Sequence, residues 1–131
     1  MSIKTFKASI LTDIKKIELH NFSVPNKLRD DQVLVKIDYT GICGSQVMEY
    51  LGNRGKDNYI PHALGHEAVG RVTVIGKKVK KVSPKDEVIL SWIKGKGLDY
   101  GGFQLTNDKN QKINFGPIST FSSHAIVSEN R

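Results

Sequence analysis

Hydrophobic and polar residues alternate with a period of two along several short stretches of the chain. Residues 33–39 and 68–75 alternate branched apolar with polar side chains, a pattern typical of strands that bury one face. Shorter runs of the same kind occupy residues 6–11, 16–19, 87–90 and 124–127. Six short strands separated by turns predict a mainly β fold, an antiparallel barrel or sandwich.

Helical character is confined to residues 45–51, which allow about two turns at most. Ser45 is expected to cap this helix, with an apolar face made of Val47, Met48, Tyr50 and Leu51. Residues 94–116 are polar and glycine-rich without a clear period. They predict one long loop, and loops of that length are often functional. The spacing Gly95-x-Gly97-x-x-x-Gly101 inside it misses the dinucleotide-binding fingerprint by one residue.

Composition and charge narrow the class of protein. The 131 residues fit one domain, and no apolar run approaches the length of about 18–20 residues that a membrane-spanning helix needs. The formal net charge is +7, with the densest basic stretch at residues 77–81. No interleaved aromatic residues or reading motif accompany that stretch, so we expect a solvated turn flank and neither a nucleic-acid nor a membrane partner.

Cys43 is the single cysteine of the chain. One cysteine cannot form an internal disulfide, and no signal-peptide pattern opens the sequence, so we expect a cytoplasmic protein. A thiolate, an imidazole and a carboxylate are ligand types that Zn²⁺ prefers, and Cys43 together with Gly65-His66-Glu67 supplies all three. Taken separately, a cysteine before a glycine also suits a small buried side chain, and a lone histidine also suits a solvated loop.

Together these residues match a larger pattern. The sequence Gly65-His66-Glu67-x-x-Gly70-x-x-x-x-x-Gly76-x-x-Val79 resembles the zinc-site signature of the medium-chain, zinc-dependent alcohol dehydrogenases, and Gly41-x-Cys43-Gly44-Ser45 resembles their first-ligand segment. The resemblance implies a GroES-like, partly open β-barrel with one or two short helices. Residues 1–131 would form this catalytic domain, and a coenzyme-binding Rossmann domain is expected beyond residue 131.

The resemblance also implies roles for individual residues. Cys43 and His66 would be ligands of one catalytic zinc, Glu67 would lie near the metal or bind it, and Ser45 would carry the proton away from the alcohol oxygen. Gly44 would lie where the backbone approaches the coenzyme, NAD or NADP. The expected substrate is a small alcohol or polyol, and the complete enzyme is expected to be a homo-oligomer. The domain alone is expected to be inactive and to hold zinc weakly or not at all.

Three departures from the family pattern matter. Gln46 and Met48 stand where many members carry an aspartate and a histidine of the proton relay, and Met48 cannot transfer a proton. One cysteine is too few for the four-cysteine structural zinc lobe, so we expect no structural zinc and a loop, residues 94–116, in place of that lobe. Lys85-Asp86 replaces the usual Gly-Asp pair before the next strand.

Two other functions stay open at this point. A GroES-like barrel could serve ring assembly without any enzymatic activity, and sizing of the purified chain would reveal such a ring. A zinc-independent quinone or enoyl reductase is the second alternative, although those members generally lack the Cys and Gly-His-Glu residues. If the domain is separated from its coenzyme domain, we expect apolar residues around Met48, Tyr50 and Ile126 to be exposed.

Overall fold

The computed structural model describes residues 3–131, which form nine strands and one helix. The first strands are β1 (Thr5–Asp13), β2 (Lys16–Ser23) and β3 (Gln32–Thr40), and the helix α1 (Gly44–Leu51) follows β3. The remaining strands are β4 (His62–Ala63), β5 (Glu67–Ile75), β6 (Glu87–Ser91), β7 (Phe103–Thr106), β8 (Lys112–Phe115) and β9 (His124–Ser128).

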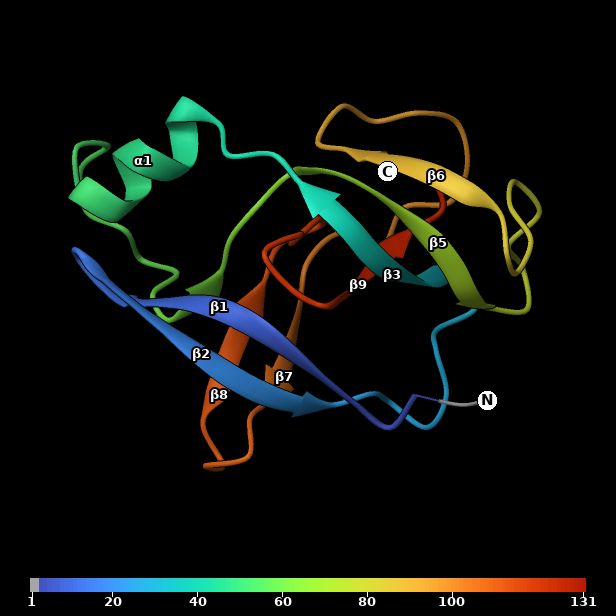
Figure 1. Cartoon of the computed structure of the whole chain (residues 1–131), viewed down its shortest axis with the longest axis horizontal. Helices are drawn as coiled ribbons and strands as arrows, with labels where there is room; N and C mark the ends of the chain where they lie inside the picture. Colours follow the sequence, from blue (N-terminus) through green and yellow to red (C-terminus); the bar gives the residue numbers. More distant parts are fainter. Residues whose placement is uncertain (1–2) are drawn as a thin grey trace.

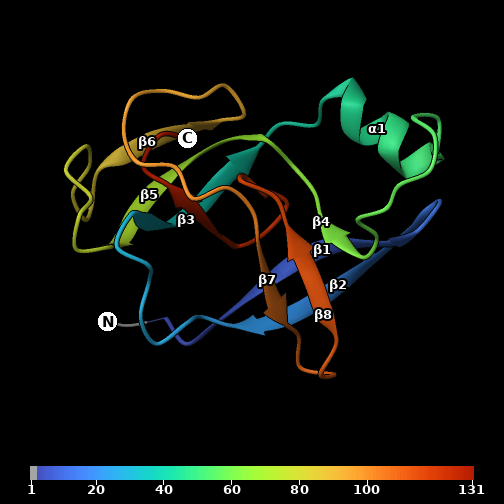
Figure 2. The same ribbon diagram turned by 180° about the vertical axis from the view of Figure 1, so that it is seen from behind.

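The strands form two sheets with the orders β2-β1-β4-β8-β7 and β6-β5-β3-β9. All strand pairs are antiparallel except β4 with β8, which meet in parallel through His62 and Asn114. Figure 1 shows the long β1–β2 hairpin crossing in front of β7 and β8, and α1 standing at one end of the molecule. The view from behind shows β4 between β1 and β8 (Figure 2). This curled, mainly β architecture confirms the predicted fold class.

Alternating side chains of the two sheets make the hydrophobic core. In β1 the inward residues Phe6, Ala8 and Ile10 are buried and pack with side chains of β2 and β8. In the other sheet the buried side chains come from β3, β5, β6 and β9: Val33, Val35, Ala68, Val72, Leu90, Ala125 and Val127. The period-two pattern therefore identified the buried faces of strands such as β2 and β5, which expose their other face to water, whereas β9 and the first half of β3 are buried on both faces.

All six strands predicted from the alternation are present, and each is extended by one or more residues at its ends. Residues 77–81 form the expected turn flank after β5: Lys78 pairs with Asp30, while Val79 is buried in the core. Of the residues described, none belongs to a helix long and apolar enough to cross a membrane.

The prediction of one loop over residues 94–116 is wrong in its second half. Residues 103–115 contain β7 and β8, an antiparallel hairpin in which Phe103 pairs with Phe115 and Leu105 with Ile113. Each strand has only four residues, so its alternation is too short to stand out in a polar segment. The turn depends on Asn107, whose side-chain oxygen accepts hydrogen bonds from the N–H groups of Lys109 and Gln111.

The predicted cap and apolar face of α1 are also wrong. Cys43 occupies the N-cap with extended backbone angles, and Ser45 lies inside the first turn. Val47 and Met48 are 46% and 41% exposed, while the one buried residue of the helix is Gln46. Tyr50 and Leu51 are half-buried. The most buried contact of the helix with the barrel is therefore a polar side chain, and half of the predicted apolar face lies outside.

The expected exposed apolar face is present in part: Met48 is exposed and Tyr50 is half-buried, but Ile126 is not exposed. Ile126 is buried against Leu28 and Leu34, because it faces inward from β9, a strand whose five residues are all buried. The exposed apolar residues also include a row across three neighbouring strands, in which Tyr39 pairs with Val69 and Val69 with Ile89. Tyr39 and Ile89 are 78% and 77% exposed.

Candidate functional site

The end of β3 and the start of β5 bring the Cys43 segment beside the Gly-His-Glu triplet. The backbone N–H of Gly41 donates to the carbonyl oxygen of Glu67 at 2.9 Å, and the Thr40 hydroxyl donates to the same oxygen at 3.1 Å. The Thr40 hydroxyl also lies 2.8 Å from that of Thr120. Residues 20 or more positions apart in the sequence therefore meet at the point where α1 begins.

Glycines allow this close approach of the backbone. A Cβ atom at Gly41 would overlap the Glu67 carboxylate, and one at Gly65 would overlap the Thr120 side chain. Gly65 also has a φ of +97°, which side chains rarely tolerate. At Gly70 a Cβ atom would overlap the backbone carbonyl of Lys36 in β3. The glycines of the motif are thus explained by strand packing around the triplet.

Gln46 connects the candidate residues with one another. Its side-chain oxygen accepts the backbone N–H of Cys43 at 2.8 Å, which completes a capping box at the start of α1. Its side-chain nitrogen lies 3.1 Å from the Ser45 hydroxyl oxygen and 3.0 Å from Nδ1 of His66. Because Gln46 is only 5% exposed, these contacts form away from bulk water.

The surroundings of Cys43 favour its thiolate. The backbone N–H and the hydroxyl of Ser45 donate hydrogen bonds to the sulfur and hold the pKa of the Cys43 thiol below its usual range. Burial and the negative charge of Glu67 act against this shift and are outweighed. The thiol is free and partly exposed at the start of a helix, where backbone N–H groups favour an anion.

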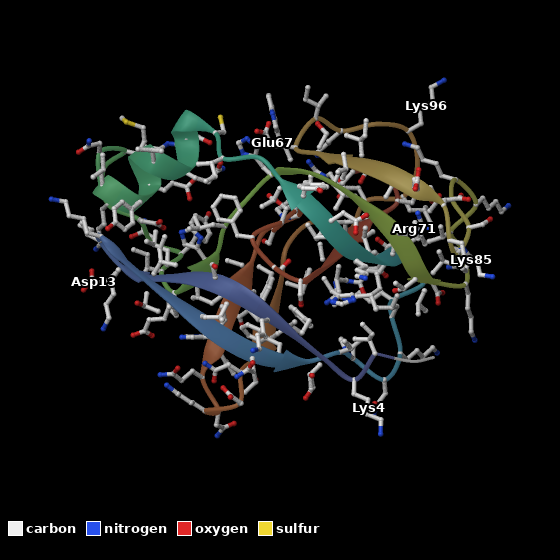
Figure 3. All side chains as sticks on the ribbon, in the orientation of Figure 1. Lys4, Asp13, Glu67, Arg71, Lys85 and Lys96 are labelled. Carbon is white, nitrogen blue, oxygen red and sulfur yellow. The ribbon has the colours of Figure 1, made fainter. Side chains whose placement is uncertain are left out.

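The donors fit zinc by chemistry, but their side chains do not converge on one point. Across residues 3–131 no group of three or more His, Cys, Asp or Glu side chains is arranged to hold a metal ion. His66 is engaged by Gln46, and the Glu67 carboxylate lies against Gly41. Figure 3 shows Glu67 between the start of α1 and the sheet that contains β5. Thiolate, imidazole and carboxylate are nonetheless a donor set typical of zinc.

Gly44, expected to lie near a coenzyme, is exposed, and a Cβ atom there would meet no atom within 4 Å.

Two neighbours of the site were not predicted. The Trp92 ring, 59% exposed, lies 6.3 Å from the His66 ring between centroids. Gln46 was noticed only as a departure from the family pattern, although a Gln three residues after an N-cap is itself a capping-box signal.

A cavity of about 870 Å³ lies beside the C-terminal half of α1. Its walls come from the helix and the loop that follows it and from the β7–β8 hairpin and the segment after it: Glu49, Tyr59, His62, Phe103, Asn114 and Gly116. Apolar and hydrogen-bonding side chains therefore face the same space. A cavity of this kind is typical of a site for a small molecule.

One wall of this cavity is fixed by an ion-paired histidine. Nε2 of His62 lies 2.7 Å from the Asp57 carboxylate, and Nδ1 lies 2.9 Å from the carbonyl oxygen of Ala63. Burial raises the pKa of Asp57, but hydrogen bonds from the backbone N–H of Tyr59 and from His62 outweigh it, so the net pKa is lowered. The loop after α1 is thereby tied to β4.

The barrel thus carries a cysteine at the start of its helix and, beside it, a Gly-His-Glu triplet at the start of β5. The sequence profile of the alcohol dehydrogenase GroES-like domain matches residues 29–131. The chain belongs to this family.

Individual relatives give the same result. The chain is 38% identical over 91 residues to D-xylulose reductase of Saccharomyces cerevisiae, covering 67% of this chain and 25% of that protein. It is 41% identical over 76 residues to sorbitol dehydrogenase of Mus musculus, covering 56% of this chain and 21% of that protein. The chain thus spans about a quarter of the length of these relatives.

The fold has a solved counterpart in CAD from Helicobacter pylori, whose crystal structure was determined in complex with NADP(H). The two structures superpose with a TM-score of 0.67 at 20% identity, over 96% of this chain and 40% of that one. The resemblance confirms the GroES-like fold.

The lowered pKa of Cys43 predicts the pH dependence of its alkylation. In the metal-free protein, the rate with iodoacetamide should reach half its maximum at a lower pH than in the urea-unfolded chain. Ser45→Ala removes the hydroxyl donor, so its midpoint should lie above that of the wild type. Ser23→Ala, at an exposed position remote in sequence, is the control and should leave the midpoint unchanged. Equal midpoints for folded and unfolded protein would contradict this assignment.

Proposed function

We propose that this chain is the catalytic domain of a zinc-dependent, NAD(P)-linked dehydrogenase that oxidises an alcohol or polyol to a carbonyl compound. The observation that carries the proposal is the hydrogen-bonded cluster at the start of α1. It holds a thiol with a lowered pKa, a hydroxyl and an imidazole around one buried amide. The dehydrogenase and reductase names of the relatives support the reaction type.

Three side chains would hold the zinc. Cys43 contributes a thiolate and His66 an imidazole nitrogen, while Glu67 contributes a carboxylate as a ligand or as a close neighbour of the metal. When bound, zinc acts as a Lewis acid that polarises the alcohol oxygen. One metal site of this kind, with no structural zinc, stays our prediction for the protein.

We assign to Ser45 the handling of the proton that the alcohol loses. Its hydroxyl accepts a hydrogen bond from Gln46 and donates one to the Cys43 sulfur, so it can exchange a proton within the cluster. Met48, which follows on α1, has only a weakly accepting thioether and cannot transfer a proton. The proton must therefore leave by water, by the coenzyme or by another side chain.

The hydride acceptor would be NAD or NADP, held by a Rossmann domain of the complete enzyme and approaching the exposed backbone at Gly44. The open space at Gly44 and the NADP(H) complex of the structural neighbour support this part of the proposal. A cytoplasmic location and a homo-oligomeric enzyme stay predictions as well.

The cavity beside α1 is proposed to receive the substrate. Glu49, one turn after Ser45, is the residue of α1 in the cavity wall. The residues of the proposed reaction centre, Cys43, Ser45, His66 and Glu67, do not line the cavity, so a substrate bound there would have to reach past Glu49 to the start of α1. The side chains of Asn58, Gln104 and Asn114 also line it and can hydrogen-bond hydroxyl groups. A polyol suits such a surface better than a purely aliphatic alcohol.

The two alternatives gain less support. Ring assembly does not explain why Cys43, Ser45 and His66 share one buried amide, and the relatives described above are enzymes. Zinc-independent reduction does not explain a cysteine held toward its thiolate form. Sizing of the purified protein distinguishes the dehydrogenase from a ring-forming assembly protein. Metal analysis distinguishes it from a zinc-independent reductase.

The ligand and proton-transfer roles predict different losses for two neighbouring substitutions. Cys43→Ser should remove both zinc and turnover, because a neutral hydroxyl is a poor zinc ligand. Ser45→Ala should retain zinc and lower the turnover number by about 10²–10⁴-fold, the usual range for general acid–base catalysis. Both variants are made in the complete enzyme, because the domain alone is expected to be inactive. Zinc content is measured by atomic emission and turnover with the coenzyme present. Stoichiometric zinc in Cys43→Ser would refute the ligand assignment.

The substrate cavity predicts an effect of side-chain volume at Gly116. A Cβ atom there has only the Ile118 carbonyl oxygen nearby, at 3.7 Å, so Gly116→Ala and Gly116→Leu should fold normally. Because the larger side chain occupies space in the cavity, Gly116→Leu in the complete enzyme should raise KM about tenfold or more, and Gly116→Ala should raise it less. Unchanged KM in the leucine variant would place the substrate elsewhere.

A further inference from the structure

Gln46 has a defined orientation, although a side-chain amide can in principle point either way. The backbone N–H of Cys43, 2.8 Å away, is a donor, so the atom that faces it must be the amide oxygen. The NH₂ group then faces the Ser45 hydroxyl oxygen at 3.1 Å and Nδ1 of His66 at 3.0 Å. The two N–H groups of the buried amide thus each have an acceptor, and its oxygen has a donor.

This orientation fixes the tautomer of His66. A nitrogen that accepts a hydrogen bond from an amide N–H carries its lone pair there, so Nδ1 of His66 has no proton. A neutral imidazole then carries its proton on Nε2. Zinc binds an imidazole through a free lone pair. In this arrangement the lone pair of Nδ1 is covered by Gln46, and Nε2 has none.

We propose that Gln46 is a positioning residue that holds His66 in a tautomer unable to bind zinc, so that metal uptake requires the amide to rotate. This inference rests on the proposed zinc site. After rotation water takes the proton from Nε2 and supplies one to Nδ1, the amide oxygen accepts a hydrogen bond from Nδ1–H, and the lone pair of Nε2 becomes free for the metal. The same rotation turns the NH₂ group toward Cys43, whose backbone N–H loses its acceptor. Metal uptake is thereby coupled to the N-terminal hydrogen bond of α1.

The tautomer is measured first, in the metal-free wild-type protein with ¹⁵N-labelled histidine. In alkaline solution, where the imidazole is neutral, the His66 signals should report a protonated Nε2 and an unprotonated Nδ1. His66→Asn assigns the signals by their disappearance. A protonated Nδ1 in the wild type overturns the proposal, whatever the metal affinity is.

Gln46→Glu supplies the matching variant. A carboxylate of the same length has two acceptor oxygens, so it can accept the N–H of Cys43 and a proton on Nδ1 of His66 together, without rotation. His66 should then show a protonated Nδ1, and zinc should bind about tenfold or more tightly than to the wild type, within the range seen for partners of metal-binding histidines. Gln111→Glu, exposed on the β7–β8 hairpin, is the charge control and should leave the affinity unchanged.

Hydrogen exchange of the Cys43 amide separates the rotation from a simple effect of charge. In the wild type this amide should exchange slowly without metal and faster with zinc. In Gln46→Glu it should exchange slowly in both states. Slow exchange in zinc-loaded wild type, or equal zinc affinity of wild type and Gln46→Glu, overturns the coupling. If neither protein binds zinc even as part of the complete enzyme, the proposed metal site fails. The tautomer of the metal-free protein then still tests whether Gln46 orients His66.

Discussion

The pairing of β3 with β5 is the constraint on which the candidate site depends. It aligns the strand that leads into α1 with the strand that begins at Glu67, and it ends in the bond between the Gly41 N–H and the Glu67 carbonyl. Without this register, Cys43 and His66 would be unrelated residues on different loops. The buried valines of the two strands stabilise it, since a shift by one residue would turn them toward water.

Polar contacts of Gln46 determine how the helix α1 packs against the barrel. The helix α1 buries a glutamine at the barrel and leaves Val47 and Met48 largely exposed, an arrangement that a helix serving only stability would not favour. A buried amide is stable only if its donors and acceptor are all paired, and at Gln46 the partners are Cys43, Ser45 and His66. The fold thus uses the candidate catalytic groups themselves to satisfy the residue that anchors the helix.

Sequence patterns predicted the strands well where the alternation was long, as in β3 and β5, because one buried face repeats every second residue. They failed for β7 and β8, whose four residues carry too little pattern, and for the helix, where apolar residues suggested the wrong face. The motif indicated Cys43, Ser45, His66 and Glu67 as candidates. It could not show that Gln46 joins three of them, because that contact depends on the fold bringing β5 beside α1.

The glycines of the motif also show which features the sequence predicts and which depend on the fold. Gly65 and Gly70 were recognised by their spacing, while the reason for each is a neighbouring atom from a different strand or segment.

The central claim, that Cys43 and His66 are brought together to hold one zinc, is tested most directly by X-ray absorption at the zinc edge of the loaded protein. The account predicts a single sulfur at about 2.3 Å together with nitrogen or oxygen donors at about 2.0–2.2 Å. A first shell of nitrogen and oxygen alone, with no sulfur, would contradict it.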